Sequence, residues 1–145
     1  MSELVVALLL WIAGETGLAM PPPPPVELLS KEQFSERAYG RSWRPGDDVW
    51  GLYDGDSGTV YLLEGWNAAE LRSRSVLLHE LVHHVQAFHR ISYECSATRE
   101  REAYDLTVKW LRGQGVADPY AVMDTDEYTL IAMSACLDFG LVQLH

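Results

Sequence analysis

The sequence is poor in basic side chains and has no apolar run long enough to cross a membrane. Lys and Arg number 11 against 21 Asp and Glu, which leaves a formal net charge of −10. A protein this acidic is a poor candidate for general binding to nucleic acids or to anionic membranes. The apolar run near the N-terminus covers residues 4–12, whereas a membrane-spanning helix needs roughly 20 such residues. We therefore expect no nucleic-acid partner and no membrane span.

Cysteine is also scarce, and the two that are present, Cys95 and Cys136, allow one disulfide. In an exported protein an even count favours a bridge, whereas in a cytosolic protein both would be small buried residues. A bridge would tie the candidate active-site segment to the last predicted helix. The sequence leaves both interpretations open, and with them the compartment. It also leaves the oligomeric state open.

Residues 1–25 form an apolar segment followed by the proline run Pro21–Pro25. Two interpretations of the apolar part stand side by side: the core of a secretory signal peptide, or a buried first helix that ends near Gly14 or Gly17. The five prolines predict an extended spacer in either case. The length of 145 residues suits one hydrophobic core, and we expect residues 26–145 to form a single domain.

Local signals predict an α+β fold, with a small antiparallel or mixed sheet that precedes a set of helices. Capping-box patterns, turn-forming residues and apolar periodicity place the elements. The predicted elements are a strand at 26–29, a helix at 30–39, hairpin strands at 49–53 and 59–63, and helices at 68–90, 97–112 and 124–139.

The middle of the chain differs in charge from both flanks. Residues 71–112 carry seven basic and five acidic side chains, and four of the five histidines lie within residues 79–89. The flanking segments 1–70 and 113–145 are both strongly acidic. This contrast marks the histidine segment as the place to look for chemistry.

Residues 79–86 read His-Glu-Leu-Val-His-His-Val-Gln, and the first five match the pattern H-E-x-x-H. In a helix, positions i and i+4 lie on one face, so His79 and His83 can direct imidazole nitrogens at one Zn²⁺ ion. Glu80 is rotated by about 100° from His79. It is therefore poorly placed as a ligand but well placed to act as general base toward a water on the metal.

Composition alone makes a chance occurrence of this pattern improbable. With 5 histidines and 12 glutamates in the chain, about 0.014 chance matches are expected. A metal-free helix with a chance histidine stripe is nevertheless an interpretation that the sequence leaves open. His84 and His89 point away from the His83 face and are expected to be surface or supporting groups. Gln86, one turn after His83, either supports the site by a hydrogen bond or is a solvated helix residue.

A catalytic zinc site needs a third protein ligand, and the predicted helix 97–112 offers Glu100 and Glu102. Residues in helical register with Glu100 are mostly apolar, whereas half of those in register with Glu102 are charged. A ligand must face the histidine helix, so the pattern favours Glu100 and leaves Glu102 as the alternative. Tyr104 or Asp105 can hold a ligating histidine in the right tautomer.

The segment His79-Glu-x-x-His83-x-x-Gln86, followed 17 residues after His83 by Glu100-Arg-Glu-Ala-Tyr104, resembles the gluzincin branch of the zincin metallopeptidases. Residues 93–97, Tyr-Glu-Cys-Ser-Ala, are similar to those of its very small bacterial domains. The resemblance implies a minimal zincin-like fold, Zn²⁺ held by His79, His83 and Glu100, and Glu80 as catalytic base. It also implies an edge strand that can pair with an extended substrate, which we assign to residues 59–63.

The chain departs from the gluzincin pattern at two places. Tyr104 stands four residues after Glu100, where an Asp is frequent in that branch, and no position matches the oxyanion-stabilising Tyr or His. Tyr93, His84 and His89 are the candidates for that role.

Two functions follow from these residues. The first is a zinc-dependent hydrolase, a metallopeptidase in which Glu80 activates zinc-bound water toward a peptide or protein substrate. The alternative is a non-catalytic zinc-binding domain that serves as a protein-interaction module.

Overall fold

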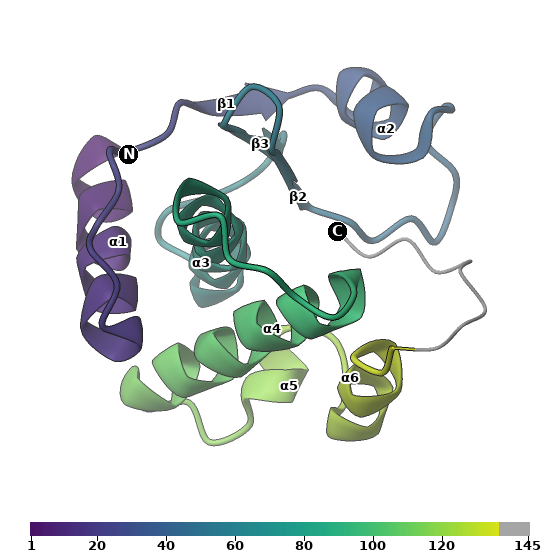
Figure 1. Ribbon diagram of the computed structural model, residues 1–145. Helices are drawn as coiled ribbons and strands as arrows, with labels where there is room; N and C mark the ends of the chain where they lie inside the picture. Colours follow the sequence, from purple (N-terminus) through teal and green to yellow (C-terminus); the bar gives the residue numbers. More distant parts are fainter. Residues whose placement is uncertain (137–145) are drawn as a thin grey trace.

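The computed structural model describes residues 1–136, which form six helices and one three-stranded mixed sheet (Figure 1). The α+β prediction is confirmed. The elements in chain order are α1 (Ser2–Thr16), β1 (Val26–Leu29), α2 (Lys31–Tyr39), β2 (Gly51–Asp54), β3 (Thr59–Leu63), α3 (Leu71–Phe88), α4 (Ser96–Gly113), α5 (Pro119–Val122) and α6 (Glu127–Met133).

The sheet has the order β1-β3-β2, with β1 parallel and β2 antiparallel to β3. The assignment of residues 59–63 to an edge strand is therefore wrong: β3 lies in the centre, and β1 and β2 are the edges. All five residues of β3 are buried. A strand that is buried along its whole length is typical of a position covered on both faces.

Alternate residues of β3 face two different hydrophobic clusters, because successive side chains of a strand point to opposite faces. Tyr61 and Leu63 pack with Phe34 of α2, whereas Val60 and Leu62 join the main core around α3. Helix α2 begins at a complete capping box and ends at a left-handed glycine, as its sequence predicts. The sheet thus lies between α2 on one side and α3 on the other.

Helix α1 is part of the main core. Its residues Val5, Leu8, Leu9 and Ile12 are buried in the same cluster as the apolar side chains of α3, and the helix ends at Gly17 in the left-handed conformation. This packing fits the buried-helix interpretation of the segment. None of the helices within residues 1–136 is both long and apolar enough to span a membrane.

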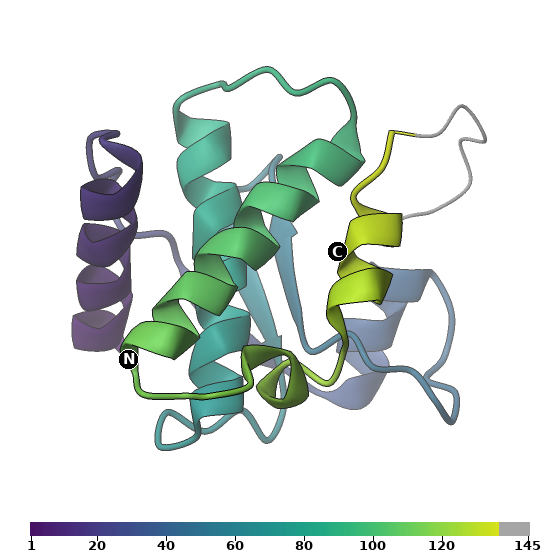
Figure 2. The same ribbon diagram turned by 90° about the horizontal axis from the view of Figure 1, so that it is seen from below.

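Helices α3 and α4 form the most extensive helix pair, and Figure 2 shows α4 crossing in front of α3. Nearly the whole of α3 from Leu77 to Gln86 is buried, including its polar residues. It begins at Leu71, three residues later than predicted, because residues 68–70 form a turn. The pair brings the histidine segment against the glutamates of α4.

The C-terminal part of the described chain folds onto α4 as two short helices. Helix α5 was not predicted, although Asp118 caps it and Pro119 occupies its first turn, a frequent start signal. Helix α6 is capped by Asp126 and ends at Met133. The prediction that this helix continues through residues 134–136 is therefore wrong, and its predicted end at residue 139 lies outside the described residues. A disulfide joins Cys95 to Cys136, which settles the question of the bridge.

Candidate metal centre

Two imidazoles meet on the buried face of α3, one helical turn apart. The Nε2 atoms of His79 and His83 lie 3.2 Å from each other, and the ring centroids are 4.8 Å apart. Both side chains are buried. The i, i+4 spacing therefore brings the two nitrogens to one point, as the sequence pattern predicts.

The carboxylate of Glu100 completes this group from the facing helix α4. Its Oε2 lies 2.9 Å from Nε2 of His79 and its Oε1 lies 3.0 Å from Nε2 of His83. Glu102 points elsewhere, to Gln86 and Tyr93. Of the two carboxylates considered, Glu100 is the one that faces the histidines.

The spacing of these atoms can be compared with that of a zinc ligand set. Ligands about 2.0–2.1 Å from a tetrahedral zinc lie about 3.3 Å from one another. The three separations in the structure are 2.9, 3.0 and 3.2 Å. Glu100 offers a different oxygen to each imidazole, so these separations join four atoms. An outward shift of a few tenths of an ångström would give the spacing of ligands around zinc, so the donor set fits the ion.

Glu100 is 2 % exposed, and the two imidazoles determine its charge. Burial raises the pKa of its carboxyl, but hydrogen bonds from His79 and His83 outweigh burial and hold the pKa below its usual range. Burial lowers the pKa of His83, whereas Glu100 and Glu80 raise it, and the net shift is upward. His83 and Glu100 thus each favour the charged form of the other.

Glu80 lies beside this triangle without belonging to it. It is 1 % exposed, and its Oε1 accepts no hydrogen bond from the described residues. Burial is the main reason that its pKa is raised, because a buried carboxylate without a partner is costly to ionise. The ligand atoms of His79, Glu80 and His83 all lie within 4.8 Å of one another.

Strand β2 holds Glu80 in place through a close approach at Gly51. A Cβ atom built on Gly51 would lie 2.6 Å from Val76 Cγ1 and 3.0 Å from Glu80 Cγ. Only a glycine therefore allows β2 to pack this closely on α3. The close approach of Gly51 limits the movement of the Glu80 side chain toward the sheet.

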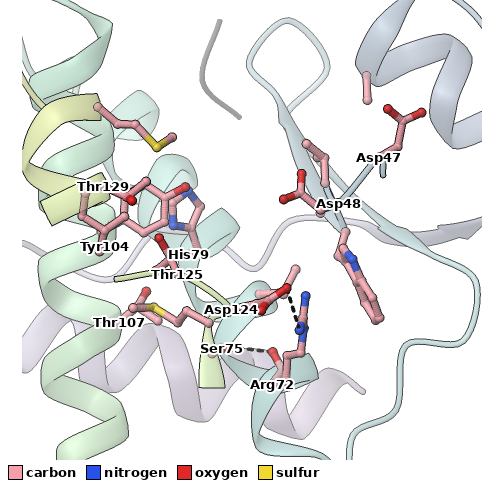
Figure 3. A pocket seen from close by; sticks show the side chains of 18 of the residues that line it. Asp47, Asp48, Arg72, Ser75, His79, Tyr104, Thr107, Asp124, Thr125 and Thr129 are labelled. Carbon is pink, nitrogen blue, oxygen red and sulfur yellow. Dashed lines mark hydrogen bonds and ion pairs between the residues drawn. The ribbon is translucent and has the colours of Figure 1, made fainter. Parts of the chain in front are cut away.

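A cleft of about 710 Å³ opens beside His79 and Glu80, within the size range of small-molecule and peptide pockets. Tyr104 of α4 also lines it, with its ring centroid 4.6 Å from that of His79. Figure 3 shows these two rings on one side of the cleft and Asp48 on the other. Burial and the nearby carboxylates raise the pKa of Tyr104, so its phenol stays protonated and able to donate.

A second, smaller cavity of about 250 Å³ lies on the other side of Glu80 and is lined by His83, Gln86 and Glu100. Residues of β2 or just before it line both spaces: Gly51 lines the cleft, and Tyr53 lines the smaller cavity. The edge strand β2 therefore runs past the whole group of buried polar side chains.

The three residues considered for oxyanion stabilisation have other partners. The ring of His84 lies between the Tyr53 hydroxyl and the Pro22 carbonyl, and His89 donates to the carbonyl of Ala19. Both histidines thus hold the segment between α1 and β1. The hydroxyl of Tyr93 donates to Glu102, and none of the three lines the cleft.

Gln86 is buried and contacts the site, although the sequence left its role undecided. Its Oε1 lies 2.8 Å from Nδ1 of His83, and its Nε2 donates to the carbonyl of Arg99 and to Glu102. It is thus a supporting group and not a solvated residue. The partners on α4 are 13 and 16 residues away along the chain, which is why no local pattern could identify them.

The chain belongs to the DUF6647 family, a domain of unknown function, which it matches over residues 1–135. The matched region includes the two histidines, Glu80 and Glu100 together with all the described helices and strands. No curated protein and no solved structure matches the chain.

Proposed function

We propose that the protein is a zinc-dependent hydrolase of the gluzincin type, and that its substrates are peptides or proteins. The observation that carries the proposal is the buried triangle of His79, His83 and Glu100, with the unpartnered carboxylate of Glu80 next to it. Burying four polar side chains together is costly, and Glu80 Oε1 has no hydrogen-bond partner among the described residues, so a metal ion with its bound water would offset a cost that the protein groups alone leave in place.

In this proposal each side chain has one task. His79, His83 and Glu100 hold Zn²⁺, and the ion when bound supplies Lewis-acid chemistry that polarises a carbonyl and acidifies water. The raised pKa of Glu80 suits a group that takes a proton from water and returns it to the leaving amine. Its position at the boundary of the two cavities supports this role.

Tyr104 takes the place of the oxyanion-stabilising residue for which the sequence offered no match. Its ring lies beside that of His79 at the wall of the cleft, tilted by 57°, and its hydroxyl has no hydrogen-bond partner among residues 1–136. A phenol in this position can donate to the negative charge that develops on a carbonyl oxygen.

The edge strand β2 supports a peptide as substrate. It replaces β3 in the role that the sequence analysis assigned to an edge strand, because β3 is paired on both sides. No strand within residues 1–136 pairs with the outer edge of β2, residues of this strand line both cavities, and an extended peptide can add to such an edge through main-chain hydrogen bonds.

The proposal is tested by incubating the zinc-loaded protein with a proteome-derived peptide library and identifying new termini by mass spectrometry. Wild-type protein should cleave a subset of peptides, and Glu80→Gln should bind zinc equally but cleave none. Zinc binding without any cleavage by the wild type would instead support a non-catalytic zinc-binding domain that serves as a protein-interaction module. Equal cleavage by both proteins would contradict the role of Glu80.

A further inference from the structure

The cleft beside His79 and Glu80 carries an excess of negative charge. The carboxylate of Glu80, which has an unpartnered oxygen, lines this cleft, so the bond that the proposed reaction cuts must enter here. The other charged side chains on the walls act on whatever enters. They are four aspartates and two arginines, namely Asp47, Asp48, Asp124, Asp126, Arg41 and Arg72.

Both arginines of the cleft are paired with aspartates. Arg41 donates two hydrogen bonds of 2.9 Å, one to each carboxylate oxygen of Asp47. Nη1 of Arg72 lies 3.8 Å from Oδ2 of Asp124, and Figure 3 shows this pair at one end of the cleft. Each arginine therefore offsets one aspartate, and two negative charges remain on the walls.

Of the two remaining aspartates, Asp48 is the one without a partner. Asp126 caps α6 and accepts hydrogen bonds from the backbone N–H and the hydroxyl of Thr129. Asp48 is exposed and makes no hydrogen bond or ion pair with any described residue. An uncompensated charge on the wall of a cleft attracts ligands of the opposite sign.

The backbone on both sides of Asp48 is held in place. The carboxylate of Asp47 accepts a hydrogen bond of 2.7 Å from the backbone N–H of Arg44. The backbone N–H of Val49 donates to the hydroxyl of Tyr39 over 3.2 Å. The position of the Asp48 backbone is therefore fixed before a ligand binds, which lowers the entropy cost of an ion pair at this point.

Asp48 also lies opposite the groups proposed to act on the substrate. Figure 3 shows it across the cleft from His79 and Tyr104, and it lies three residues before Gly51, where the edge strand β2 begins. A peptide that fills the space between these walls, with a carbonyl group toward His79 and Tyr104, presents a neighbouring side chain to Asp48.

We propose that Asp48 is the specificity-determining residue of the cleft, and that the substrates are peptides with a lysine or arginine side chain next to the bond that is cut. The cleavage rests on the proposed function, whereas the selection of a basic side chain requires neither zinc nor hydrolysis. Because Asp48 is exposed, solvent screens its charge, and we expect a preference of about fivefold, the upper range for exposed ion pairs.

The test compares two blocked pentapeptides that differ only in the charge of the central side chain. Four alanines surround an arginine in one peptide and its uncharged isostere citrulline in the other. Each peptide is titrated into full-length, zinc-free, ¹⁵N-labelled protein, and ¹H–¹⁵N correlation spectra follow the backbone amides of Asp48, Val49 and Tyr104. The arginine peptide should shift these amides and bind about fivefold more tightly. Equal affinities, or no shifts in the cleft, would overturn the inference.

Aspartate variants show whether Asp48 is responsible for the preference. Asp48→Asn should abolish the difference between the two peptides, and Asp48→Lys should prefer a pentapeptide with a central glutamate. Both variants should remain folded, because the side chain is exposed and unbonded. Asp56→Asn, at an exposed position of the turn between β2 and β3 and outside the cleft, should keep the preference. A preference that persists in Asp48→Asn would contradict the role of Asp48.

The peptide-library experiment separates this inference from the proposed function. Lysine and arginine should be enriched about fivefold beside the new termini with the wild type, but not with Asp48→Asn. Cleavage without this enrichment, together with equal binding of the two pentapeptides, would refute the role of Asp48 and leave the proposed function standing. Preferential binding of the arginine peptide without any cleavage would contradict the proposed function, while Asp48 would still select the ligands of the cleft.

Discussion

Glu80→Gln should stabilise the zinc-free protein while it abolishes hydrolysis by the zinc-loaded protein. Glu80 is 1 % exposed and its Oε1 has no hydrogen-bond partner among the described residues. An unpaired buried group of this kind costs about 1–3 kcal/mol, and more when it is charged. A glutamine keeps the shape but carries no charge. We therefore expect a gain of about 1 kcal/mol, or about 2–4 °C in Tm for a chain of this size.

The gain should depend on pH in a direction set by the raised pKa of Glu80. The usual pKa of a glutamate is 4.5, and the folded protein binds the proton more tightly than the unfolded chain. Wild-type stability is therefore lost as the pH rises above that value. The Tm difference between variant and wild type should be small at about pH 4 and larger at about pH 7.

Thermal unfolding of the two zinc-free proteins measures this difference, and exposed Glu94→Gln is the control that should show no such trend. Hydrolysis by the zinc-loaded variant should fall by about 10²–10⁴-fold, as expected for the loss of a general base. A variant less stable than the wild type at neutral pH, or a Tm difference that shrinks as the pH rises, would refute the description of Glu80 as a buried, unpaired carboxylate.

Three further predictions test the surroundings of the site. Tyr104→Phe should lower kcat by about 10²-fold with zinc content unchanged, whereas Tyr128→Phe, at a residue 85 % exposed, should have no effect; equal kcat for both would exclude Tyr104 as a donor. Gly51→Ala should destabilise the protein by about 1–3 kcal/mol through overpacking, measured by urea unfolding, with Gly55→Ala as a control in open space. Replacing both disulfide cysteines by serine should lower the free energy of unfolding by about 4 kcal/mol, since the bridge closes a loop of 41 residues, and a loss below 1 kcal/mol would contradict the entropic estimate.

The parts of the fold that could be predicted from the sequence depend on local signals. The capping box of Ser30 and Gln33, the turn between β2 and β3, and the apolar period of α3 all act within a few residues. The same holds for His79 and His83, because a helix alone determines the distance between i and i+4. Helical register likewise brought Glu100, and not Glu102, to the inward face of α4.

The parts that could not be predicted depend on contacts between distant segments. The central position of β3 requires the chain to return parallel to β1 after passing through α2 and β2, and no local pattern within 59–63 encodes that return. The apolar run of α1 is equally compatible with a signal peptide until its packing on α3 is known. The environment of Tyr104 and the network of Gln86 depend on how α4 packs against α3.

The account as a whole depends on one metal ion at His79, His83 and Glu100. The most direct test is to measure the metal content of purified protein by inductively coupled plasma mass spectrometry, after dialysis into a buffer that contains zinc. We predict one zinc per chain in the wild type and in His89→Ala, whose histidine bonds to Ala19 away from the site. His79→Ala should lose the zinc while its circular dichroism stays that of a folded protein. Wild-type protein without zinc, or a folded His79→Ala variant that retains it, would contradict the central claim.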